Sequence, residues 1–423
     1  MTDAAALAPA GRGRVVSGRA VSGRDAGLTL LTVAVFFSAY LTWRPFDIMF
    51  TLSDGLFCLA ALALLAGQGV RGAPFGAFTG AWVTGFLLMI LGLLIGSIVN
   101  GDPLRWIITT LQYSFAFMVL PFLLVGHGLA RTINLARGLV AGVAAMEVFG
   151  IAVYVLIDGS FEENRRFGLD FISGSRRLGV FLSDANWNGA VIAMTVPFVL
   201  FLAARRQLSQ RAAALLLLVF LVGGVLAASV SALACGLTGV AMMMLAGGLR
   251  PPPKLIAAGV AGVAIYAATG NGLPAAFGAR VLPALESGDL ANAGTFSGRL
   301  ALMQEAWRIV GDTMFVGLGA DQYRVVSASG APVHNVYLLL WAEGGIAALV
   351  GWLVMLLVLL GIAAAALRRD RLAGALGLAV TMSFIVSSIA SPHMYARMWV
   401  VPVLLAVALI FASAEQPRPS KEP

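Results

Sequence analysis

Long apolar runs recur along almost the whole chain, and they constrain its fold more than any other feature. Each run holds about 17–25 mostly apolar residues, enough for an α-helix to cross the hydrocarbon core of a bilayer. The runs lie at 26–43, 46–66, 76–98, 104–126, 139–157, 187–203, 212–229, 231–247, 255–270, 345–366, 372–390 and 396–413. The sequence therefore predicts an all-α polytopic membrane protein with about 12 transmembrane helices and both termini on one side.

Composition and charge agree with this fold class. Hydrophobic residues make up 60% of the chain and charged residues 11%, a balance that excludes a soluble globular domain. The net charge of +8 does not indicate a nucleic-acid partner, because the basic residues sit between the apolar runs, as membrane orientation requires. Their bias toward one side predicts cytosolic tails at 1–25 and 414–423 around a transmembrane domain at 26–413.

Two segments on the opposite, outer side depart from this charge bias. Segments 158–186 and 271–333 carry eight arginines between them, and long ordered loops are usually functional. Within the second segment, apolar residues at helical spacing over 298–310 predict an amphipathic helix against the outer membrane face. Arg299 would lie on the first turn of that helix. We therefore expect the functional site at this face.

The dipeptide His334-Asn335 lies where the second outer segment meets a strongly apolar helix. Histidine is the side chain whose ordinary pKa lets it exchange a proton near neutral pH, so His334 is a candidate general base for an acceptor hydroxyl. Asn335 would then orient the ring or the substrate. The alternative interpretation is structural, with His334 as a polar residue at a helix start and Asn335 as the N-cap.

Arginines supply the second candidate feature. Arg176 and Arg177 directly precede a span, and guanidinium geometry suits bidentate contact with a diphosphate. The alternative is that these side chains extend from the membrane interface to water. Arg299 is open to the same two interpretations. Arg280 is a further substrate contact or simply a solvated charge.

Three acids fall in or beside apolar runs, namely Asp54, Glu147 and Glu343. Acids within a membrane are costly and therefore indicate function by default. We expect Glu343 to help shape the His334 site. Asp54 and Glu147 are equally well explained as buried partners of arginine or backbone groups. His393, in a short outer turn, is expected to be structural.

Nothing in the sequence indicates a metal or a cofactor. The stretch from Gly317 to Asp321 lacks the strand–helix context of a nucleotide fingerprint and is predicted to be a turn. Cys58 and Cys235 fall in apolar runs without metal-ligand spacing, so packing is their expected role. The predicted chemistry is metal-free.

Three stretches carry a family resemblance. Arg177 to Asn186 pairs an Arg-x-Gly segment with an Asn before a span, 298–319 joins an Arg…Trp helix to a Gly-x-Gly turn, and 334–345 reads His-Asn-x9-Gly. Together they resemble the O-antigen ligase and Wzy-type polysaccharide polymerase superfamily. The chain departs from the family pattern at Ser231-Ala232-Leu233, where members often carry Ser-Arg-Gly, and at Ala348.

The resemblance implies a GT-C-like glycosyltransferase of the bacterial inner membrane with its site in large periplasmic loops. The donor would be a glycan on a polyprenyl diphosphate, and the acceptor lipid A-core for a ligase or another lipid-linked glycan for a polymerase. His334 would be the base and Arg177 and Arg299 phosphate ligands, with the substrate contacts supplied by Asn335, Arg176, Arg280 and Glu343. Membrane lipid would be a further partner, and no cofactor, metal or nucleic acid would be required.

Two other classes stay open. A secondary transporter or lipid-linked glycan flippase suits twelve helices equally well, although transporters often show matching interruptions in two repeated halves, which this sequence lacks. A catalytically inactive scaffold of a polysaccharide assembly complex is the third possibility, since one arginine of the family pattern is missing at Ala232.

Overall fold

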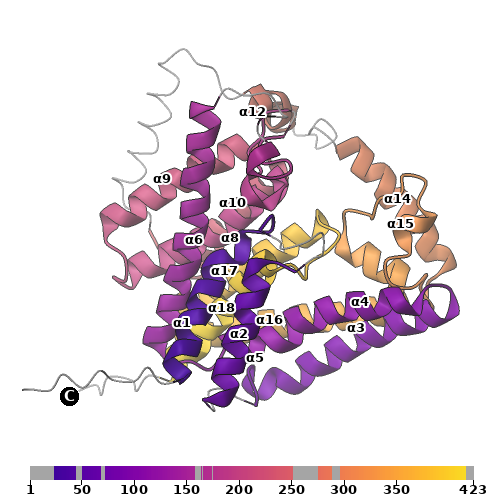
Figure 1. The fold of residues 1–423 in the computed structure, drawn as a ribbon, viewed down its shortest axis with the longest axis horizontal. Coiled ribbons are helices and arrows are strands. Elements are labelled where there is room, and N and C mark those ends of the chain that lie inside the picture. The colour runs from indigo at the N-terminus through magenta and orange to yellow at the C-terminus, as the bar shows by residue number, and fades with distance from the viewer. Residues whose placement is uncertain are drawn as a thin grey trace, which may run out of the picture.

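The computed structural model describes residues 23–43, 50–67, 72–157, 163, 165–173, 175–250, 275–287 and 296–415 (Figure 1). The first half contains α1 (Gly23–Phe36), α2 (Leu52–Ala66), α3 (Thr79–Val99), α4 (Pro103–Ser114), α5 (Leu120–Leu124) and α6 (Leu129–Leu156). The second half contains α8 (Ala185–Ala204), α9 (Gln210–Ala227), α10 (Val230–Leu245), α12 (Ala275–Arg280), α13 (Leu282–Ser287), α14 (Phe296–Asp312), α15 (Tyr323–Val326), α16 (Val336–Leu367), α17 (Arg371–Ile389) and α18 (Arg397–Ala414). Short 3-10 or π turns occur at Phe37–Ala39, Gly76–Phe78, Phe115–Val119, Arg165–Phe167 and Val180–Leu182.

The regular secondary structure of the described part is helical, apart from a single β-bridge between Ile172 and Leu178. It holds 8 helices long and apolar enough to cross a membrane. These lie at Gly76–Val99, Pro103–Leu124, Leu129–Leu156, Ala185–Ala204, Gln210–Ala227, Val336–Leu367, Arg371–Ile389 and Arg397–Ala414. The prediction of a multi-pass, all-α membrane protein is therefore confirmed.

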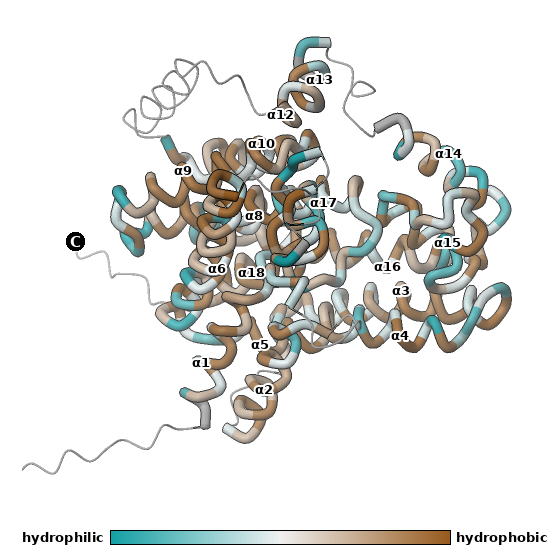
Figure 2. The backbone as a smooth tube through the Cα atoms, turned by 45° about the horizontal axis from the view of Figure 1, so that its top comes forward, coloured by the Kyte–Doolittle hydropathy of each residue, from teal (hydrophilic) through white to brown (hydrophobic). Residues whose placement is uncertain are grey.

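The other four predicted spans have a different outcome. Three coincide with shorter apolar helices at Asp25–Ala39, Leu52–Ala66 and Val230–Leu245. The fourth, 255–270, lies outside the described residues, as do most of the two predicted tails and parts of both outer segments. Figure 2 shows apolar residues over most of the helices, with hydrophilic residues concentrated at helix ends and around α14 and α15.

Two helices begin about ten residues before the apolar runs that they contain. Helix α6 begins at Leu129 rather than 139, so Arg131 and Arg137 lie in its first turns, where Arg131 pairs with Asp25 at 3.2 Å. Helix α16 begins at Val336 rather than 345. Helix α6 includes charged residues before its apolar run, and α16 begins at the Asn335 cap. Both helices can extend beyond the apolar run because helical hydrogen bonds do not require apolar side chains.

Small residues let α3 and α16 pack closely along much of their length. A Cβ at Gly85 would meet the carbonyl oxygen of Gly351, and one at Gly92 would meet that of Gly344. Glycine at these positions lets the two backbones approach, which is how helices associate when lipid is the solvent. Figure 1 shows α14 and α15 grouped together above the right-hand ends of α3 and α4.

The long helices separate two sets of charged residues. Helix α8 runs from Ala185, close in sequence to Arg177, to Ala204 beside Arg205. Helix α16 runs from Val336, next to His334, to Leu367 beside Arg368. Arg205, at the C-terminal end of α8, forms an ion pair with Asp370, which follows the C-terminal end of α16. The arginines predicted to be cytosolic at 205 and 368 thus lie at the opposite helix ends from Arg177 and His334.

Candidate functional site

His334 lies immediately before α16, and the cap of that helix fixes its position. The Asn335 side chain accepts hydrogen bonds from the backbone N–H groups of Tyr337 at 3.0 Å and Leu338 at 3.1 Å. Asn335 is only 7% exposed. The N-cap interpretation of Asn335 is therefore confirmed, and its amide oxygen is occupied by the helix. His334 stays the candidate base, held on a rigid helix end.

Helix α14 brings Arg299 to the same region. It spans Phe296–Asp312, slightly longer than predicted, with Arg299 on its first turn. Its buried apolar residues, Ala306 and Val310, pack with Leu339 and Ala342 of α16. The first turns of α16 therefore cover part of the apolar face of α14. Trp307 is the exception: it is 62% exposed and packs edge-on against Trp341.

A carboxylate fastens α14 to the segment that follows α15. Glu305 accepts hydrogen bonds from the Ser327 hydroxyl and the Ala328 amide, both at 2.9 Å, and from the Tyr323 hydroxyl at 3.3 Å. The Ala328 bond is the main reason that the pKa of Glu305 lies below its ordinary value. These contacts hold α14, and with it Arg299, in a fixed orientation toward α16.

Two charged side chains, one on α14 and one at the cap of α8, act on His334. Burial lowers the pKa of His334, the Arg299 charge lowers it further, and the Asp184 carboxylate opposes both. Asp184 is the N-cap of α8 and accepts from the amide of Trp187 at 3.1 Å. The imidazole is therefore neutral at pH 7, the form that a general base requires. Asp184 was missed from the sequence, although an Asp directly before a span is a recognisable cap.

Arg176 and Arg177 diverge. Arg177 is 7% exposed, and its Nε donates to the Ala227 carbonyl at 2.9 Å while an Nη donates to Asn186 at 2.8 Å. Arg176 is exposed, with φ at 53° and its guanidinium over the Tyr154 ring. The two guanidinium groups thus have different neighbours and do not form one clamp. The side chain of Arg280 lies outside the described residues.

Helix α16 is interrupted at Gly345, and the predicted turn is inserted there. Gly345 has φ 63° and ψ −170°, a non-helical conformation inside a 32-residue helix. The Ile346 amide donates to the Met314 carbonyl at 2.9 Å. The Leu318 amide donates to Ala342 at 2.9 Å and the Gly319 amide to Glu343 at 2.8 Å. Irregular backbone at this depth is acceptable because the protein satisfies its polar groups.

Glu343 contacts the inserted turn. Its carboxylate accepts from the Tyr323 amide at 3.1 Å, so it anchors the end of the inserted turn. From the other side, the Ser97 hydroxyl accepts from the Ala320 amide at 2.9 Å, and Asn100 donates to the Gly317 carbonyl at 3.1 Å. Glu343 therefore stabilises the loop that flanks the site.

A polar pocket of about 210 Å³ lies between α4, α16 and the turn after α17. Its polar lining comprises Arg105, Thr109, Gln112, Tyr113, Asp321, Glu343, His393 and Tyr395. Arg105 pairs with Asp321 at 3.3 Å. Within the described chain, the side chains of Thr109, Gln112 and His393 have no hydrogen-bonding partner, so they are available to a ligand or to water.

The pocket adjoins the His334 region. Its wall includes Leu339, about one helical turn beyond Asn335, and His393 interacts electrostatically with His334. Burial lowers the pKa of His393 to about 4, so this ring is neutral and polar at pH 7. His393 was expected to be structural, and the structure places it in this pocket. The polar residues of α4 at 105, 109 and 112 share one helix face, a signal the sequence contained.

The two other intramembrane acids are both buried. Asp54 forms a buried ion pair with Arg397 and completes a capping box with Thr51, so it is a buried partner. Glu147 is fully buried in α6, where a Cβ at Gly223 would collide with its carboxylate.

Among the described residues, no group of three or more His, Cys, Asp or Glu side chains has the arrangement of a metal site. No protein-family model matches the sequence, and no curated protein is significantly similar to it.

Proposed function

We propose that this protein is an integral-membrane glycosyltransferase of the O-antigen ligase and polysaccharide polymerase type. It would act at the periplasmic face of the bacterial inner membrane on a polyprenyl-diphosphate-linked glycan, in the synthesis of a surface polysaccharide. The observation that supports this proposal most is the His334 imidazole, which is neutral at pH 7 and directly precedes the capped start of α16, with the charges of Arg299 and Asp184 acting on it in opposite directions. The polar pocket beside it offers room for a sugar ring.

In the proposed reaction, an acceptor hydroxyl attacks the anomeric carbon of the donor glycan. His334 takes the hydroxyl proton as the new glycosidic bond forms, and the bond from that carbon to the diphosphate oxygen breaks. The bond electrons leave with the polyprenyl diphosphate, whose negative charge Arg299 stabilises. Positive charge placed where negative charge develops makes a metal unnecessary in this scheme.

Arg177 has a role in the proposal that is separate from that of Arg299. Its guanidinium contacts the Ala227 carbonyl, at the turn leading to Ser231, where the family resemblance expects a further arginine. We assign Arg177 the positive charge at this turn, together with the positioning of Asn186. Arg299, which is half-buried on the first turn of α14, is assigned the closer contact with the diphosphate.

The test is glycan transfer by the purified protein in liposomes, given a polyprenyl-diphosphate oligosaccharide with or without lipid A-core. A ladder of longer lipid-linked glycans without core indicates a polymerase, and a single core-dependent shift indicates a ligase. His334→Ala and Arg299→Ala should each abolish transfer without loss of folded protein. Arg308→Ala, which removes an exposed arginine from the same helix, is the matched control and should retain activity.

A secondary transporter or flippase is the second candidate, and the interrupted α16 favours it. Discontinuous helices with buried polar backbone commonly form the substrate sites of transporters. Flux of a lipid-linked glycan that survives His334→Ala, with no transfer by the wild-type protein, would replace the enzyme proposal with this one.

A further inference from the structure

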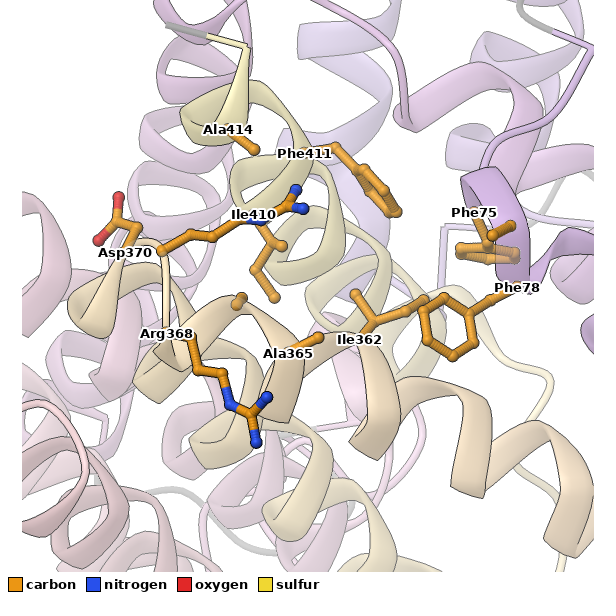
Figure 3. A pocket seen from close by; sticks show the side chains of 12 residues that line it. Phe75, Phe78, Ile362, Ala365, Arg368, Asp370, Ile410, Phe411 and Ala414 are labelled. Carbon is orange, nitrogen blue, oxygen red and sulfur yellow. The ribbon is translucent and has the colours of Figure 1, made fainter. Parts of the chain in front are cut away.

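At the other end of α16 lies a larger pocket of different character (Figure 3). Its volume is about 460 Å³, and its walls come from the segment before α3 and the last turns of α16 and α18. The apolar lining includes Phe75, Phe78, Ile362, Ala365 and Phe411. Figure 3 shows Phe75 and Phe78 at one end of the pocket, and Arg368 and Asp370 toward the other.

The charges at the polar end do not cancel. Asp370 pairs with Arg205 and also accepts from the Ala373 amide as the cap of α17, so its carboxylate is already engaged. Arg368 and Arg369 are both exposed, and neither forms an ion pair within the described part of the chain. The polar end therefore carries two uncompensated positive charges next to an apolar groove.

We propose that this pocket binds an anionic phospholipid, with one acyl chain between Phe78, Ile362 and Phe411 and the headgroup phosphate at Arg368 and Arg369. The apolar walls of the pocket lie at the ends of three helices that are long and apolar enough to cross a membrane. Bilayer lipid is therefore the solvent that surrounds these walls. Guanidinium groups bind phosphate through paired hydrogen bonds, and basic pockets between transmembrane helices are typical of anionic-lipid sites. This proposal is independent of the enzymatic one.

Native mass spectrometry of the full-length protein, released from nanodiscs, tests the site. Nanodiscs of phosphatidylethanolamine with cardiolipin or phosphatidylglycerol should yield protein that retains anionic lipid and little phosphatidylethanolamine. In Arg368→Gln/Arg369→Gln, affinity for the anionic lipid should fall about 30-fold, as expected for two arginines near a charged surface. Arg211→Gln, another exposed arginine at this end of the protein, is the matched control and should change nothing.

A second variant distinguishes lipid binding in the groove from general attraction of anionic lipid to surface charge. Ala365→Trp keeps both arginines and fills the groove, so it too should lose the lipid. If Ala365→Trp retained as much anionic lipid as the wild type, the acyl chain would not bind in the groove. If Arg211→Gln lost as much lipid as the double variant, the headgroup site at Arg368 and Arg369 would not be specific. If the double variant does not fold, the wild-type protein at 0.5 M salt replaces it, and undiminished retention there would also contradict the proposal.

Discussion

Gly345 decides whether α16 is broken, and replacing it tests how the candidate site is assembled. Its backbone, at φ 63° and ψ −170°, lies in a region open essentially to glycine, where another residue costs about 1–3 kcal/mol. A Cβ there would also collide with the carbonyl group of Phe315. We predict that Gly345→Ala favours an unbroken α16 and releases the segment 313–322 from it.

The size of the effect follows from the hydrogen bonds that the break creates. A straight helix would return the Ala342 and Glu343 carbonyls to amides within α16, and the Ile346 amide to a carbonyl one turn earlier. The inserted segment would lose three backbone hydrogen bonds, each with a net value of about 0.5–1.5 kcal/mol. The total is about 3 kcal/mol, so the segment should open on the order of 100-fold more often.

Hydrogen exchange measured by mass spectrometry on the protein in nanodiscs reports this opening. Exchange across 314–323 should accelerate in Gly345→Ala, and glycan transfer should fall with it. Gly361→Ala is the matched control, because that helical position of α16 would place its Cβ against only the Phe78 ring, at 3.4 Å. Unchanged exchange across 314–323 in Gly345→Ala would refute the reasoning.

Three further predictions concern the site itself. Because burial and Arg299 lower the pKa of His334 below the ordinary 6.5, transfer should persist at pH 6.5 and fall as the pH drops further and the ring is protonated; Arg299→Gln should raise the pKa of His334 in an NMR titration of the imidazole, which needs no activity, and an unmoved pKa would contradict the assignment. Arg177→Ala should lower thermal stability by about 3 kcal/mol, since two hydrogen bonds from a buried cation are lost, whereas Arg308→Ala at an exposed position of α14 should leave the melting temperature unchanged. Gln112→Leu should raise the acceptor KM about tenfold at constant kcat, and Leu111→Ala on the exposed face of α4 should not; equal KM values in the two variants would remove Gln112 from the acceptor pocket.

Part of the site was predictable because its signals are local in sequence. The Asn335 cap, the helix carrying Arg299 and the turn at Gly317–Asp321 depend on residues a few positions apart. Helical period, cap preference and turn chemistry therefore identify them. The apolar runs fixed the fold class for the same reason, since a single helix must cover the bilayer core by itself.

Tertiary structure alone decided which of these local features meet. Asp184 precedes Arg299 and His334 by more than a hundred residues of chain, and Arg105 reaches Asp321 across a still longer interval. Hydropathy does not specify which helices become neighbours, because lipid and protein interiors are similarly apolar. The break at Gly345 likewise depends on a distant loop that supplies the hydrogen bonds α16 gives up. Sequence determined the helices and their caps, and packing determined the site.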